Sequence, residues 1–328
     1  MKTSILSIIA TFIYSQCLTA DEVKISLSKP PAIELQFGLQ LEYPSLRIIG
    51  RMQNNKLPIF RTCFLGENDN PLVFRNLDGR SMKTSDGRNM IMLTFEEYEE
   101  PCVKPIQFRV GEAAWLDEKI RSISRCLTID KSQDGFLEIV WQNWGIRVQK
   151  EINNGKHFES NGITFYFDGG FKKFDPATIP IRQDLDLVFA PKIILYDYVK
   201  FTKDCYESRD LVFFMRNNAK KKILEVQNES IVVLTADGKP AMVDGVPFSI
   251  AVTKGTALEP GKSLKESQSL LDVCSAFAKT RLPAGFYRLR WQVEVSYEDN
   301  EKKSFSSNEL WVYHGKYEAT KGAEKDLE

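Results

Sequence analysis

Short runs of aromatic and β-branched residues alternate with polar positions along most of the chain. Within 163–167, Ile163, Phe165 and Phe167 alternate with Thr164 and Tyr166, which is the two-residue period of a β-strand. Asp-Gly and Asn-Asn pairs mark turns between such runs. Many short strands without a regular alternation of strands and helices predict an all-β chain built as sandwiches of two antiparallel sheets.

The pattern occurs twice in the chain. Segment 135–141 (GFLEIVW) recurs as 285–291 (GFYRLRW), an offset of 150 (285 minus 135), and Ser160-Asn161 recurs as Ser307-Asn308, an offset of 147 (307 minus 160). Further pairs in the same order are Gly111 with Gly261, Asp78-Gly79 with Asp237-Gly238, 51–56 with 214–219, and Pro31 and Leu35 with Pro191 and Leu195. Self-similarity at a long period indicates a duplicated unit. We predict one sandwich over 21–168 and a second over 183–315.

Two features recur inside each unit. Trp141 and Trp291 occupy equivalent positions and are predicted to fill the two cores. Before each of these strands, apolar residues follow a helical spacing, which predicts a short helical segment that bridges the sheets. These residues are Trp115, Leu116, Ile120 and Ile123 in the first unit, and Leu264, Leu270, Leu271, Cys274 and Phe277 in the second.

The ends of the chain and the link between the units differ in composition from the sandwiches. Residues 1–20 hold Lys2, an apolar run and Ala20 at a cleavage position, which predicts a secretory signal peptide and a secreted or periplasmic protein. A lipoprotein signal with Cys17 lipidated is the alternative. Residues 169–182 contain Gly and Pro and predict a hinge, and the charged tail 316–328 is predicted to be disordered.

Composition excludes some classes of partner. The chain has 44 Lys+Arg and 44 Asp+Glu, so it lacks the basic excess that nucleic-acid binding needs. After the first twenty residues no apolar run is long enough to span a membrane. Five cysteines remain there: Cys63, Cys102, Cys126, Cys205 and Cys274. They form no C-x-x-C pair, and the spacing leaves open whether they form disulfides or stay as buried thiols.

Residues near the end of the chain carry a resemblance to a known domain type. Segments 258–263 (LEPGKS) and 282–289 (LPAGFYRL), followed by Ser307-Asn308-Glu309, resemble bacterial immunoglobulin-like sandwiches, in particular the domain of the intracellular proteinase inhibitor (BsuPI-like) family. The resemblance implies tandem immunoglobulin-like domains and, as one possible role, inhibition of a proteinase. The first unit departs from it, because Val110-Gly111-Glu112 lacks the proline.

The chain carries few residues suited to catalysis. Its two histidines, His157 and His314, lie in no G-x-S-x-G motif and near no patterned cysteine. Asp184 with Asp186, and the acidic run Glu96, Glu97, Glu99 and Glu100, offer carboxylates for calcium, although solvated acidic loops explain them better. We therefore predict no enzyme activity, no cofactor and no metal, with an unrecognised active site as a further alternative.

Aromatic residues are the remaining candidates for a site. Trp115, Trp144 and Trp311 have no aromatic counterpart in the other unit. Exposed tryptophans on a β-sandwich anchor sugars or protein partners, and partly exposed ones also fill interfaces between domains. The sequence therefore predicts an exported, non-catalytic binding or structural module that recognises a protein or a glycan, with these three tryptophans as binding residues. It does not indicate the ligand or the oligomeric state.

Overall fold

The computed structural model describes most of the predicted strands and not the chain ends. The described residues are 33–41, 46–56, 59–62, 72–80, 91–92, 106–119, 134–143, 158–168, 173–198, 202–252 and 256–315. The predicted signal peptide and tail, the acidic run 96–100, Trp144, His157 and the helical residues Ile120 and Ile123 lie outside them. Contacts between residues divide the chain into residues 1–31 and residues 32–328. Everything below concerns residues 32–328.

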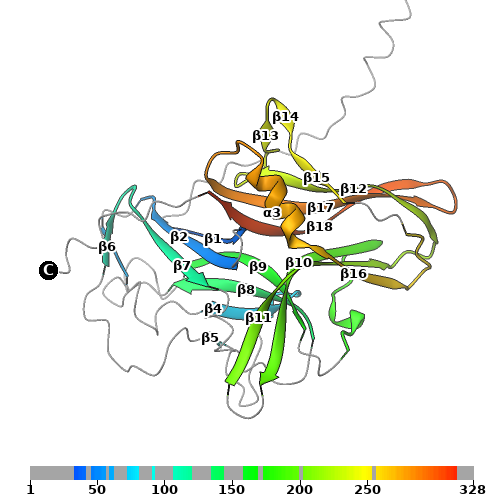
Figure 1. Ribbon diagram of the computed structural model, residues 1–328, viewed down its shortest axis with the longest axis horizontal. Helices are drawn as coiled ribbons and strands as arrows, with labels where there is room; N and C mark the ends of the chain where they lie inside the picture. Colours follow the sequence, from blue (N-terminus) through cyan, green and yellow to red (C-terminus); the bar gives the residue numbers. More distant parts are fainter. Residues whose placement is uncertain are drawn as a thin grey trace, which may run out of the picture. The chain divides into compact units, whose positions relative to one another are not determined.

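The described residues form an all-β fold dominated by two seven-stranded sheets (Figure 1). Sheet I has the order β15-β12-β17-β18-β1-β2-β7, and sheet II has the order β16-β11-β10-β9-β8-β4-β5. The strands of sheet I are β1 (Ile33–Leu41), β2 (Leu46–Asn54), β7 (Ala113–Lys119), β12 (Ile223–Thr235), β15 (Ser249–Ala251), β17 (Gly285–Tyr297) and β18 (Lys302–His314). Those of sheet II are β4 (Leu72–Asn76), β5 (Ile91–Met92), β8 (Gly135–Asn143), β9 (Phe158–Asp168), β10 (Leu185–Tyr198), β11 (Thr202–Asn217) and β16 (Ser263–Ser269). The fold class that the sequence predicts is thereby confirmed.

Smaller elements connect these strands. They are the hairpin of β13 (Met242–Val243) and β14 (Val246–Pro247), the pair β3 (Ile59–Thr62) and β6 (Ile106–Arg109), the 3₁₀ turn η2 (Pro176–Thr178) and the helix α3 (Leu270–Ala278). Helix α3 confirms the helical segment predicted for the second unit. In the first repeat Trp115 and Leu116 lie on strand β7 instead. Ile120 and Ile123 lie outside the described residues, so a helical segment there stays a prediction. Leu264 of the second repeat lies on strand β16.

Each large sheet combines strands from both repeats. In sheet I, strands β15, β12, β17 and β18 of the second repeat join β1, β2 and β7 of the first. In sheet II, β5, β4, β8 and β9 of the first repeat join β10, β11 and β16 of the second. Both junctions are parallel strand pairs, with Leu39 opposite Val312 in sheet I and Lys192 opposite Tyr166 in sheet II. The two sheets therefore have the same strand order with the repeats exchanged.

Hydrogen bonds recur at the junctions in the same way. The side chain of Asn161 accepts from the backbone N–H of Phe37 and donates to its carbonyl, at 2.9 and 2.5 Å. Asn308 does the same with Phe189, at 2.9 and 3.0 Å. Each asparagine thus ties the last strand of a repeat to the first strand of the same repeat across the sandwich.

The repeated tryptophans are equivalent, as the sequence predicts. The N–H of Trp141 donates to Ser160 Oγ at 3.0 Å, and that of Trp291 donates to Ser307 Oγ at 3.0 Å. Their side chains are 1 % and 3 % exposed. Asn54 and Asn217 are equivalent positions, and their partners on the neighbouring strands are Ile33 and Leu185. Ile33 and Leu185 are therefore counterparts, at an offset of 152 (185 minus 33). The predicted pairing of Leu35 with Leu195 does not have this offset and is wrong.

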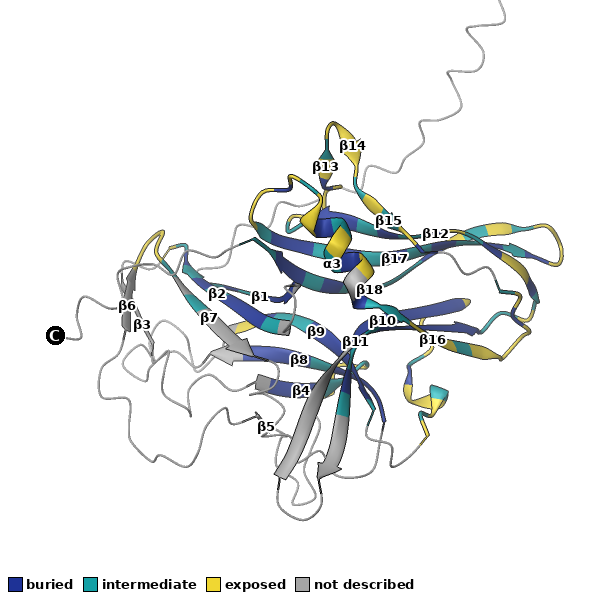
Figure 2. Ribbon diagram, viewed as in Figure 1, coloured by how far each residue is buried: buried dark blue, intermediate teal, exposed yellow. Residues whose placement is uncertain are grey.

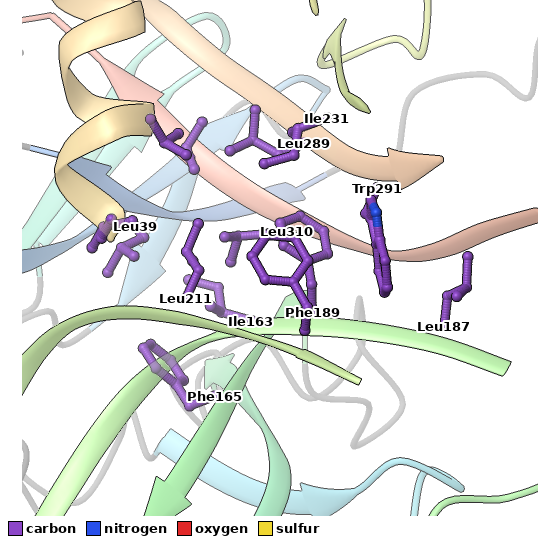
Figure 3. Close-up of a cluster of buried hydrophobic side chains, with 14 of the residues drawn as sticks. Leu39, Ile163, Phe165, Leu187, Phe189, Leu211, Ile231, Leu289, Trp291 and Leu310 are labelled. Carbon is purple, nitrogen blue, oxygen red and sulfur yellow. The ribbon is translucent and has the colours of Figure 1, made fainter. Parts of the chain in front are cut away.

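One hydrophobic core runs between the sheets through both repeats. Strand β17 alternates, with Leu289, Trp291 and Val293 buried between less buried neighbours, because successive side chains point to opposite faces of a sheet. Figure 2 shows this alternation along the strands. In Figure 3, Leu39 and Ile163 of the first repeat lie among Leu310 and Phe189 of the second. The domain limits 21–168 and 183–315 stay a prediction.

Candidate binding surface

The face of sheet I that points away from the core carries a second, smaller cluster. Its members come from both repeats: Ile49, Phe286 and Tyr313 are buried, and Trp115, Ala236 and Trp311 are partly buried. We call these six residues the outer-face cluster. The structure therefore brings together two of the three tryptophans that the sequence selected, Trp115 and Trp311.

Trp115 lies over the seam between the repeats. Its ring is parallel to that of Phe286, with centroids 6.2 Å apart and planes at 4°, and it meets Tyr313 edge-on at 5.6 Å. The guanidinium of Arg51 lies 5.6 Å from the indole centroid. Phe286 itself passes over Gly38, where an added Cβ would come within 2.9 Å of the Phe286 ring. The missing side chain of Gly38 therefore makes room for this aromatic contact.

The ring of Trp311 contacts a network of charged side chains. Arg288 lies 4.9 Å from its ring centroid and also donates to the carbonyl of Ala236 and to Glu309, the latter at 3.1 Å. Arg290 pairs with the same carboxylate. Burial alone would raise the pKa of Glu309, but the hydrogen bonds from Arg290 and Arg288 outweigh it and lower that pKa. Glu309 is therefore ionised and holds both arginines in place.

The equivalent face of sheet II is covered by the chain itself. Residues 173–184, which we call the linker strap, place Phe174 edge-on against Phe136, Tyr166 and Phe214, at 5.7, 5.8 and 5.3 Å. Phe136, Tyr166 and Phe214 are the repeat counterparts of Phe286, Tyr313 and Arg51, at offsets of 150, 147 and 163. Trp115 thus fills on sheet I the place that Phe174 fills on sheet II.

Buried polar contacts fix the linker strap. The guanidinium of Arg216 donates to the carbonyls of Pro176 and Ile179 at 2.7 and 2.9 Å and to Asp186 at 2.6 Å. Asp186 also accepts from the amide of Asn218 at 2.6 Å. The carboxylate of Asp186, which with Asp184 is one of the candidate calcium sites, is therefore used in holding the strap. These contacts hold residues 176–186 against sheet II, and the hinge over 169–182 stays a prediction.

Lys265 occupies the counterpart of Trp115 (265 minus 115 is 150). Its ammonium donates to the hydroxyl of Tyr166 at 2.6 Å and lies 4.5 Å from that ring centroid. Burial is the main cause of the lowered pKa of Lys265. Near the junction between the repeats, each sheet therefore has a cation that lies over an aromatic ring. The pair is Arg51 and Trp115 in sheet I, and Lys265 and Tyr166 in sheet II.

The catalytic candidates of the sequence have packing roles where they are described. His314 lies against the rings of Phe277 and Tyr287, with centroids 5.6 and 6.3 Å apart. Cys274 is a free, half-buried thiol whose pKa burial raises to about 11. Among the residues with described positions, no three His, Cys, Asp or Glu side chains gather as metal ligands. In the same part of the chain no helix is long and apolar enough to cross a membrane.

A cavity of about 20 Å³ lies between the sheets of the second repeat. Trp291, Met215 and Glu229 are among its lining residues, and Asn228 beside it has a left-handed backbone with φ of 51°. A volume of this size holds about one water molecule, which is too small for a substrate.

The charged members of the surface were not predicted from the sequence. Arg288 and Arg290 alternate with buried Tyr287 and Leu289, so the two-residue period could have placed both arginines on the outer face. Arg51 has no comparable signal. Its contact with Trp115 depends on the pairing of β2 with β7, where the two residues are opposite.

Comparisons with known proteins do not identify a family. No protein-family model matches the chain, and no curated protein matches significantly. Among solved structures, a transglutaminase of red sea bream matches 88 % of this chain and 32 % of its own, at 10 % identity and a TM-score of 0.20. A variant of BcpA, the major pilin subunit of Bacillus cereus, matches 88 % of this chain and 67 % of its own, at 10 % identity and a TM-score of 0.15. The chain spans about a third of the transglutaminase, and such low TM-scores carry no functional inference.

Proposed function

We propose that this protein is an exported, non-catalytic module of the cell envelope or extracellular space that recognises a protein partner through the outer face of sheet I. The observation that carries the proposal is the composition of this face. Trp115, Trp311 and Tyr313 gather there with the arginines at positions 51, 288 and 290. Tryptophan, tyrosine and arginine are the residue types that most often dominate protein interfaces.

A protein partner fits this face better than a glycan does. A sugar ring stacks on an open aromatic face, whereas Trp115 already has Phe286 parallel to it and Arg51 over it. Trp311 has Arg288 over its ring. The ring edges, hydroxyl and guanidinium groups that remain favour a partner that offers both apolar side chains and hydrogen-bond acceptors.

Binding experiments test this function with matched variants. The mature protein would be immobilised and exposed to surface proteins of the organism that produces it and, separately, to a panel of glycans. We expect a protein to be captured, and Trp311→Ala and Arg288→Ala to weaken its binding by at least about tenfold. Ile181→Ala is the control, because Ile181 is 71 % exposed on the linker strap at the other sheet, and it should have no effect.

Three outcomes would contradict the proposal. Capture of a glycan instead of a protein would assign the face to sugars. Capture that Trp311→Ala leaves unchanged would place the site elsewhere. Hydrolysis of a peptide, ester or polysaccharide that is lost when His157 and His314 are both replaced by Gln would show that the protein is an enzyme.

A further inference from the structure

Arg51 is a cation of the sheet I surface whose charge has no described counterpart. Arg288 and Arg290 share the carboxylate of Glu309. The guanidinium of Arg51, in contrast, makes no ion pair with the described residues, and its Nε is buried without a hydrogen bond there. Among these four groups there are three cations and one carboxylate. Glu34, on the same face of β1, accepts hydrogen bonds from Gln36 and Asn55 and makes no ion pair with Arg51.

The second repeat shows that packing does not require a charge at this position. The counterpart of Arg51 is Phe214 (214 minus 51 is 163, as for Asn54 and Asn217), and Phe214 is fully buried against Phe174. In that repeat the cation is at the facing position instead, because Lys265 lies opposite Phe214 and donates to the Tyr166 hydroxyl. Arg51 on sheet I lies over a ring in the same way, but it has no such acceptor among the described residues.

A second hydrogen-bond donor, the hydroxyl of Tyr313, belongs to a ring that contacts the same indole as Arg51. Tyr313 meets Trp115 edge-on at 5.6 Å, and Arg51 lies over the same indole. Burial raises the pKa of Tyr313, and the charge of Arg51 opposes that rise, so the two groups are within electrostatic reach of each other. No hydrogen bond joins the Tyr313 hydroxyl to the residues that the structure describes.

A guanidinium and a neighbouring hydroxyl are together suited to a carboxylate, which accepts paired N–H donors in a fixed geometry. We infer that Arg51, with the hydroxyl of Tyr313, binds a carboxylate of an acidic segment in the partner protein. The inference rests on the proposed function and names the chemistry of the partner. Positive charge on the face and acidic side chains on the partner are complementary, which also steers their association.

Titration of labelled poly-L-glutamate into the full mature protein tests the inference. We expect binding that weakens as salt rises and that Arg51→Gln reduces by about tenfold or more. Arg51→Lys, which keeps the charge but loses the paired donors, should give an intermediate loss. The control is Lys302→Gln, which removes one charge from the far end of β18 and should change binding little. Circular dichroism and thermal melting establish that each variant is folded.

Several results would overturn the inference. These are poly-L-glutamate that fails to bind, binding that Arg51→Gln leaves unchanged, and preference for poly-L-lysine. Polygalacturonate that binds more tightly than poly-L-glutamate, through Arg51, would assign the site to an acidic glycan. A captured protein that depends on Trp311 and not on Arg51 would overturn this inference while leaving the proposed function intact.

Discussion

Trp141 and Trp291 are the largest side chains shared by the two repeats, and each is nearly inaccessible to solvent. Replacing either with Ala should lower the free energy of unfolding by about 3–5 kcal/mol, because a large cavity opens between the sheets. Trp311→Ala should cost less, since that ring is only partly buried. Denaturant midpoints of the three variants measure the difference. Equal losses for all three would contradict the assignment of the two repeated tryptophans to the core.

Glu309 makes stability depend on pH at the acidic end. Its pKa in the folded protein is lowered by Arg290 and Arg288 against the effect of burial, so folding favours the ionised form. That stabilisation is complete above the ordinary glutamate pKa and is lost as pH falls through the lowered value. Wild type should therefore melt above Glu309→Gln at neutral pH, and the gap should close in acid. A gap in melting temperature that stays constant with pH would refute this role for the carboxylate.

At the scale of elements, alternation of apolar residues predicts strands well where one face is buried. It succeeds for β9 and β17, whose inward residues enter the core. It does not reveal β7, because Trp115 and Leu116 are adjacent apolar residues and do not alternate, and the outward Trp115 joins a cluster of its own. Helix α3 could be recognised because its apolar residues continue over nine positions, which is longer than one turn.

Two glycines that sit in strands are expected to respond differently to substitution. An added Cβ at Gly38 would lie 2.9 Å from the Phe286 ring and 3.1 Å from the backbone of Val312. At Gly162 it would overlap the Cγ, Cδ and Oε1 atoms of Glu138, at 2.0–2.4 Å, but no backbone atom, and this flexible side chain can change rotamer. Gly38→Ala should therefore cost about 1–3 kcal/mol of stability, and Gly162→Ala much less. Urea unfolding compares them, and a greater loss at Gly162 would contradict the seam geometry.

The candidate surface depends on contacts that sequence patterns do not report. Trp115 and Trp311 stand out in the sequence as tryptophans without an aromatic counterpart, but they are 196 positions apart (311 minus 115). They belong to one cluster because β1 pairs with β18. Duplication predicts two similar units. It does not predict that their sheets join edge to edge, since each unit read alone could close its own sandwich. The shared seam, and with it the cluster of aromatic and arginine residues, therefore comes from the structure.

Joined sheets should make the two repeats unfold together. A separate second repeat would expose the edge of β18 that β1 covers and the edge of β10 that β9 covers. It would also expose core residues that now contact the first repeat, and unpaired edges with apolar surface disfavour an isolated fold. We expect one calorimetric transition for residues 21–328, with the van't Hoff and calorimetric enthalpies equal, and no cooperative transition for residues 183–315 alone. Two resolved transitions, or a fragment that melts at the temperature of the whole chain, would show that the repeats are independent domains that merely lie side by side.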